Sequence, residues 1–216
     1  MELLNEVDVR VLGSLIEKEL TTPEHYPLSL NALVNACNQS SNRDPVVRFD
    51  EGTVKAGVDR LRKYSLVRSI QRADARVMKY MHLTNETMNL ERPEIAALCV
   101  LMLRGPQTVG EIRTRSGRLF EFPSLEDVEA TLDRLIARSA SPLVTRLERQ
   151  PGQKEARYAH LLSGDVAAAP QVAVDARADV PAELDRYAAL ESVVESLRRE
   201  VADLRAEVGE LRRLFE

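Results

Sequence analysis

The chain has 216 residues, 44% hydrophobic and 30% charged, which suits a soluble protein of one large or two small domains without a membrane-spanning apolar run. Two cysteines are too few for a disulfide framework and lack the paired spacing of a zinc site, and the acidic opening segment shows no secretory signal, so we expect the cytoplasm. The formal net charge of −4 means that any binding of nucleic acid must come from a local basic patch.

The first half of the chain is predicted to form three helices followed by a hairpin. Apolar residues follow helical spacing from Val9 to Leu20, and the two prolines of TTPEHYP then break the chain. Ser29 and Asp50 stand where they can cap a second and a third helix. After the third helix, LVRSIQR and RVMKYMHL are typical of two short strands around the tip ADA.

The second half repeats this order of elements. A helix from Glu94 to Leu103 is expected to end at Gly105, and Thr108 and Ser124 can cap the next two helices. LVTRLER and ARYAHLL then flank a turn at Pro151-Gly152 as two short strands. The order helix, helix, helix, hairpin is therefore expected twice.

Matching residues support a duplication. The triplet Asp59-Arg60-Leu61 aligns with Asp133-Arg134-Leu135 at an offset of 74 residues. The last strand of each hairpin carries a related pentapeptide, KYMHL at 79–83 and RYAHL at 157–161, at an offset of 78 residues. Self-similarity of this size, with a single repetition, indicates two copies of a small domain.

Each pentapeptide places a tyrosine and a histidine two residues apart. Tyr80 and His82 are therefore expected to share one strand face, as are Tyr158 and His160. Packing under the hairpin is the favoured role for these residues, because no carboxylate or cysteine stands at ligand spacing from either histidine. No metal or other cofactor is predicted.

Three helices followed by a two-stranded hairpin is the winged-helix arrangement, in which the third helix is the recognition helix. We therefore predict a mainly α protein with small β-hairpin wings (α+β), built as two tandem winged-helix domains plus a C-terminal coiled-coil helix. In chain order, the predicted parts are the first winged-helix domain (1–90), the second (91–164), a flexible linker (165–182) and the coiled-coil helix (183–216).

Three long stretches carry a family resemblance. They read EKELTTPEHYPLSLNALVNACNQSSNRDPV at 17–46, LMLRGPQTVGEIRTRSGRLFEF at 101–122 and LVTRLERQPGQKEARYAHLLSGDV at 143–166. Together they resemble the YceH-like family of bacterial proteins over almost the whole chain up to about residue 166. The resemblance implies a tandem winged-helix architecture and supplies no catalytic or binding residue.

Only the first copy is predicted to have a basic reading surface. Residues 50–65, which include the third helix, have a net charge of +1, and the wing at 66–83 has a net charge of +3. The corresponding helix of the second copy, at 124–138, has a net charge of −2 and should repel a DNA groove. The residues predicted to contact DNA are Lys55, Arg60, Arg62, Lys63, Arg72 and Arg76. A solvated helix face is the alternative interpretation of this charge.

The tail shows a heptad pattern. Val194, Val201 and Val208 occupy position a, with leucine at position d, which favours a parallel two-stranded coiled coil. Glu200 and Glu207 stand at position g, where a parallel partner would offer arginines at position e. The residues predicted to form the dimer are Leu190, Val194, Leu197, Val201, Leu204, Val208 and Leu211. The alternative is a helix that folds back onto its own chain.

Two functions remain open on this sequence. The first is a homodimer that binds double-stranded DNA through its first winged helix, as a transcriptional regulator does. The second is a protein-interaction module of a larger assembly, such as a chromosome-segregation accessory subunit, without direct DNA binding. An enzyme is not expected, because the chain lacks a phosphate-binding glycine loop, a nucleophile elbow and metal-ligand spacing.

Overall fold

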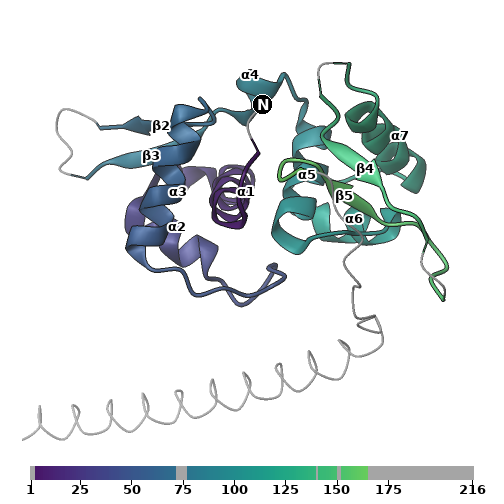
Figure 1. The fold of residues 1–216 in the computed structure, drawn as a ribbon, viewed down its shortest axis with the longest axis horizontal. Coiled ribbons are helices and arrows are strands. Elements are labelled where there is room, and N and C mark those ends of the chain that lie inside the picture. The colour runs from purple at the N-terminus through teal and green to yellow at the C-terminus, as the bar shows by residue number, and fades with distance from the viewer. Residues whose placement is uncertain (1–2, 72–76, 140, 150–151, 165–216) are drawn as a thin grey trace, which may run out of the picture. The chain divides into compact units, whose positions relative to one another are not determined.

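The computed structural model describes residues 3–71, 77–139, 141–149 and 152–164, all of which belong to one compact unit. Two successive groups of three main helices and a hairpin make up this unit (Figure 1). The predicted fold class, mainly α with small antiparallel β-hairpins, is confirmed. The wing tip with Arg72 and Arg76, the linker at 165–182 and the predicted coiled coil at 183–216 lie outside the described residues.

The first group, called repeat 1, contains the three helices expected from the caps. Ser29 Oγ accepts a hydrogen bond from the amide of Ala32, and Asp50 Oδ1 accepts one from the amide of Thr53, so both predicted caps are confirmed. Capping of this kind satisfies backbone amides that have no partner inside the helix. The helices are α1 (Glu6–Thr21), α2 (Leu30–Cys37) and α3 (Glu51–Lys63).

The hairpin of repeat 1 belongs to a three-stranded antiparallel sheet of order β1-β3-β2. β2 and β3 are the predicted strands, whereas β1 is a two-residue strand that the sequence pattern did not reveal. Tyr80 of β3 pairs with both neighbours. The strands span Leu28–Ser29 (β1), Val67–Ile70 (β2) and Lys79–His82 (β3); a short helix η1 (Pro23–His25) precedes the sheet and α4 (Thr84–Met88) follows it.

The second group, called repeat 2, has the same local construction. Thr108 and Ser124 both form capping boxes, and Gly105 ends its helix with a φ of 69°, so these predictions are confirmed. Tyr158 pairs with Gln107, as Tyr80 of repeat 1 pairs with Leu28. The elements are α5 (Arg92–Arg104), α6 (Val109–Ser116), α7 (Leu125–Ile136), β4 (Val144–Arg146) and β5 (Tyr158–His160).

The two repeats meet through their first helices. Every residue of α1 from Asp8 to Glu17, and every residue of α5 from Glu94 to Leu103, is buried, as expected for helices that pack on all sides. A Cβ atom on Gly13 would lie 2.9 Å from Leu103 Cδ2, so a residue without a side chain allows the close approach. The core residues form one continuous cluster across both repeats. The domain boundary near residue 90 stays a prediction.

Candidate nucleic-acid interface and the arginine network that supports it

The cationic side chains of α3 do not all face solvent. Arg62 and Lys63 are exposed at its C-terminal end. Lys55, which lies one helical turn before Asp59 in the sequence, is partly exposed. Lys55 Nζ lies 2.6 Å from Asp59 Oδ2, and Arg62 Nη1 lies 3.4 Å from Asp59 Oδ1. Exposed pairs of this kind contribute little to stability and exchange readily for other partners. These three cations therefore form the accessible basic surface of α3.

Arg60 has a different place. Its Nε atom donates to Asp8 Oδ1 at 2.9 Å, and Asp8 is only 1% exposed at the start of α1. Asp8 also accepts from the backbone amide of Asn5 in the capping box of α1. Through this ion pair the guanidinium of Arg60 holds α3 against the first turn of α1.

The same contact recurs in repeat 2. Arg134, which aligns with Arg60, places Nε 3.5 Å from Glu94 Oε1, and Glu94 completes the capping box at the start of α5. In both repeats the arginine of the Asp-Arg-Leu triplet therefore reaches the acidic cap residue of the first helix. This recurrence gives the aligned triplets an architectural role. The Arg60 side chain stays 34% exposed, and its contact with DNA stays a prediction.

The hairpin of repeat 1 adds two further exposed cations. Arg68 on β2 and Lys79 on β3 are both exposed, and Arg68 Nη2 approaches the sulfur of Met81 at 3.5 Å. Arg72 and Arg76, also predicted to contact DNA, lie outside the described residues. Within the described part of the wing, positive charge thus continues from α3 onto the sheet.

The third helix of repeat 2 presents the opposite charge. Glu126, Glu129 and Asp133 of α7 are exposed, and no basic residue accompanies them on the helix except Arg134 in its last turn. A phosphate backbone would meet net negative charge here. The predicted contrast in charge between the third helices of the two repeats is therefore present on the surface.

The loop at 38–50 sets the start of α3. At one end, Asn38 accepts from the amide of Phe49 and donates to its carbonyl, both at 2.8 Å, which closes the loop like a backbone pair. In the middle, Arg43 turns inward and its side chain is fully buried. The sequence pattern identified this segment as a loop and gave no sign of its buried arginine.

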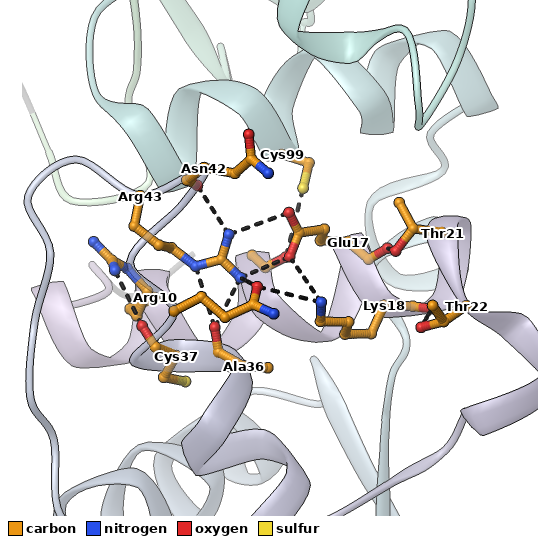
Figure 2. A network of polar contacts seen from close by, with 12 residues as sticks. Arg10, Glu17, Lys18, Thr21, Thr22, Ala36, Cys37, Asn42, Arg43 and Cys99 are labelled. Atoms are coloured by element: carbon orange, nitrogen blue, oxygen red, sulfur yellow. Dashed lines mark hydrogen bonds and ion pairs between the residues drawn. The ribbon is translucent and has the colours of Figure 1, made fainter. Parts of the chain in front are cut away.

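Arg43 is the centre of a polar network (Figure 2). Its Nη2 donates to Glu17 Oε2 at 2.6 Å and its Nη1 to Glu17 Oε1 at 3.1 Å, a two-point contact between a guanidinium and a carboxylate. Nε and Nη2 also donate to the carbonyl of Ala36 at the end of α2. One side chain thus ties α1, α2 and the loop before α3 together.

The cysteines lie close to this network without taking a chemical role in it. Cys37 and Cys99 are both free and buried, and burial raises the pKa of each thiol. A thiol with a raised pKa is a poor nucleophile and metal ligand. Within the described ranges, no group of three or more His, Cys, Asp or Glu side chains is placed to hold a metal ion.

The two pentapeptide histidines differ in their surroundings. His82 Nε2 lies 2.7 Å from Glu19 Oε2, and His82 Nδ1 accepts from the amide of Thr84. His160 Nδ1 is buried and has no hydrogen-bond partner, and burial lowers the pKa of His160 to about 4. The shared packing of the tyrosines is confirmed, because Tyr80 and Tyr158 are both buried.

A family model described as "Protein of unknown function, DUF480" matches residues 4–153, which cover repeat 1 and repeat 2 up to the segment before β5. The chain belongs to this family. A UPF0502 protein of Pelobacter propionicus is 53% identical over 219 residues, covering 99% of each chain. A UPF0502 protein of Opitutus terrae is 52% identical, covering 92% of this chain and 84% of the relative.

A more distant UPF0502 protein, from Aliivibrio fischeri, is 44% identical and covers 100% of this chain and 97% of the relative. The family membership expected from the three sequence stretches is confirmed. The alignment with the Pelobacter propionicus protein covers 99% of this chain and therefore includes the tail, which lies beyond the DUF480 match. None of these descriptions names an activity.

None of the helices in the described ranges combines the length and the apolar character needed for a transmembrane span.

Replacing Glu17 by Leu should destabilise the protein by about 3–5 kcal/mol, because the charge of Arg43 would stay buried without its carboxylate. The double variant Glu17→Leu/Arg43→Met should recover much of this loss, since it removes both charges. Arg48→Met, at an exposed arginine of the same loop, is the control and should change stability by less than about 0.5 kcal/mol. Chemical denaturation measures all four proteins; a double variant less stable than Glu17→Leu would contradict this role.

His160 predicts a pH dependence of stability. Its folded pKa of about 4 lies below the ordinary value of 6.5, so the unfolded chain binds the proton first as the pH falls. This contribution is present above pH 6.5 and is lost as the pH falls toward 4, by about 1–3 kcal/mol. His160→Gln should remove that part of the dependence, whereas His25→Gln, at an exposed histidine, should not. Identical profiles for His160→Gln and the wild type would contradict the assignment.

Proposed function

We propose that this protein is a cytoplasmic, non-enzymatic tandem winged-helix protein that binds double-stranded DNA through repeat 1. The observation that carries the proposal is a set of accessible cations on α3 and on the strands of the hairpin that follows it. Its members in the described residues are Lys55, Arg62, Lys63, Arg68 and Lys79. Arg72 and Arg76, predicted from the sequence to contact DNA as well, lie outside the described residues.

This surface suits backbone contact more than base recognition. Lysine and arginine neutralise phosphates and release counterions, which supplies binding that is independent of sequence and sensitive to salt. The N-terminal turn of α3 carries Asp50 and Glu51, so phosphate contact is expected at its C-terminal end and on the wing. For one such surface we expect a Kd on the order of 10⁻⁴–10⁻⁶ M at physiological salt.

Dimerisation through the tail would strengthen this weak binding. Two linked copies make the second DNA contact intramolecular, which raises the apparent affinity without new residues. The support is the heptad pattern of the predicted dimer residues from Leu190 to Leu211, which lie outside the described residues. A parallel homodimer used as a transcriptional regulator is the form of the proposal that we favour.

The acidic face of α7 favours a second candidate function. Exposed Glu126, Glu129 and Asp133 would suit a basic protein surface instead of DNA. In that case the protein is an interaction module of a larger assembly, such as a chromosome-segregation accessory subunit, and its net charge of −4 is part of the recognition. The two functions differ in whether salt-dependent DNA binding exists at all.

The double reversal Arg62→Glu/Lys63→Glu should weaken binding to a fluorescent duplex of about 25 base pairs at least tenfold at low salt. It should also reduce the slope of log affinity against log salt by about 2, since two phosphate contacts are lost. Arg60 is left intact, because its contact with Asp8 would confuse loss of binding with loss of folding. Fluorescence anisotropy across a salt series gives both values.

The matched control for this experiment is Arg146→Glu/Arg149→Glu, which makes the same change of charge at exposed positions of repeat 2. It should keep most of the affinity and of the salt slope. Equal weakening by the two double variants would show a response to net charge alone. That result, or a wild-type protein that never binds the duplex, would overturn the DNA-binding proposal.

The tail makes a separate prediction about assembly. Leu197→Glu/Leu204→Glu places charges at two d positions and should convert a dimer into a monomer, as measured by analytical ultracentrifugation. Ala202→Glu/Ala206→Glu adds the same charge at positions b and f, away from the expected seam, and should leave the dimer intact. A wild-type protein that sediments as a monomer would remove the dimer from the proposal.

A further inference from the structure

A cavity of about 240 Å³ lies where parts of both repeats meet. Repeat 1 contributes α1 and the loop before α3, and repeat 2 contributes the end of α5 and the segment around β5. An engineered cavity of roughly 150 Å³ in another protein is large enough to bind benzene. The cavity here therefore has room for a small organic molecule. Its apolar lining includes Val9, Val47, Phe49, Leu101 and Met102.

Arg10 gives this cavity a buried positive charge. Its side chain donates to the carbonyl of Cys37 at 3.2 Å and to the carbonyl of Pro45 at 2.6 Å, and the residue is 5% exposed (Figure 2 shows the contact with Cys37). Among the described residues, no carboxylate lies within 4.0 Å of its guanidinium. Two of the five N–H donors of an arginine are accounted for by these carbonyls.

Arg10 is unusual beside Arg43. Buried charges are normally paired, and Arg43 has the carboxylate of Glu17, whereas the hydrogen bonds of Arg10 go to carbonyl groups. Burial, and after it the neighbouring charge of Arg43, lower the pKa of Arg10, while Asp44 and Glu17 act in the opposite direction without an ion pair to its guanidinium. An anion that entered the cavity would supply this ion pair.

His160 lines the same cavity from the side of repeat 2. Burial favours its neutral ring, and its Nδ1 atom is buried and makes no hydrogen bond within the described part of the chain. Because Nδ1 is buried, the residue serves as part of the cavity wall. Arg10 from α1 therefore supplies the cationic donor of the cavity, and His160 from β5 contributes to its wall.

The rim limits the charge that the ligand can carry. Glu6 and Asp44 line the cavity at exposed positions, so they face solvent as well as any entering molecule. Their negative charges disfavour phosphate esters and other multiply charged anions. The apolar lining in turn favours a ligand with a hydrocarbon body.

We infer that this cavity is a binding site for a small monocarboxylate with an apolar body. The carboxylate accepts hydrogen bonds from Arg10, and the hydrocarbon part packs against Val47, Phe49 and Met102. Because these residues come from both repeats, the ligand stabilises their packing against each other. The site is separate from the α3 surface and does not depend on DNA binding.

Hexanoate, leucine and hexan-1-ol are suitable probes for the full-length protein. At about 10 mM, enough for a Kd near 1 mM, hexanoate or leucine should raise the melting temperature and shift the His160 ring signals in NMR spectra. Hexan-1-ol has the same hydrocarbon body without the charge and should do neither. Binding of leucine as well as hexanoate would place its ammonium group beside Glu6 and Asp44. Failure of both carboxylates, or an equal effect of hexan-1-ol, would overturn the inference.

Variants assign the effect to the cavity. Arg10→Met should weaken hexanoate binding at least tenfold, whereas Arg48→Met, at an exposed arginine of the same loop, should leave it unchanged. Since Arg10 also anchors two carbonyls, Val47→Trp provides a second test that keeps the cation and fills the cavity from a loop. Circular dichroism establishes that each variant is folded. Hexanoate binding retained in folded Val47→Trp, or in folded Arg10→Met, would place the ligand elsewhere.

Discussion

The ion pair between Arg43 and Glu17 fixes the position of the loop that precedes α3. Any contact of α3 with DNA depends on that position. A fully buried guanidinium meets both oxygens of one carboxylate and also donates to the carbonyl of Ala36 near the end of α2. Removing a charge from water costs several kcal/mol, and only complete pairing of this kind offsets that cost. The geometry therefore favours one position of the loop at 38–50, and with it one starting point for α3. Because the start of α3 is fixed, the accessible cations of α3 have defined positions on the surface.

The two repeats share the contacts of the backbone and of the helix caps more closely than they share surface charge. Arg60 and Arg134 make the same reach from the third helix to the acidic cap residue of the first helix. The tyrosines of both pentapeptides pair with the segment before the second helix. Charge on the third helices, by contrast, has opposite sign in the two repeats. Charged residues that align between the two repeats therefore indicate shared structural contacts more than shared binding contacts. Arg60 is an example, because its aligned partner Arg134 makes the same contact.

The sequence predicted what local chemistry determines. Caps at Ser29, Asp50, Thr108 and Ser124 each depend on an amide three residues away, so the helix starts were readable without a partner. Arg43 and Glu17 are 26 residues apart, and Arg60 and Asp8 are 52 apart, so no periodicity reveals either pair. The two-residue strand β1 was not predicted for a related reason, because it forms only where β3 supplies its hydrogen bonds. The cavity likewise needs both repeats in place before its lining exists.

Arg10 and Arg43 show how burial separates structure from function in this core. Both are cations within the first repeat's interior, and both hold carbonyls of α2 or the following loop. Replacing a buried ion pair by apolar side chains of similar volume is often neutral or stabilising, and a buried charge without a close carboxylate has even less to offset its desolvation. Glu17 offsets that cost for Arg43 inside the protein. For Arg10 the described residues supply carbonyl acceptors at hydrogen-bond distance, with Asp44 and Glu17 acting from farther away, and the adjoining cavity lets an external carboxylate complete the pair.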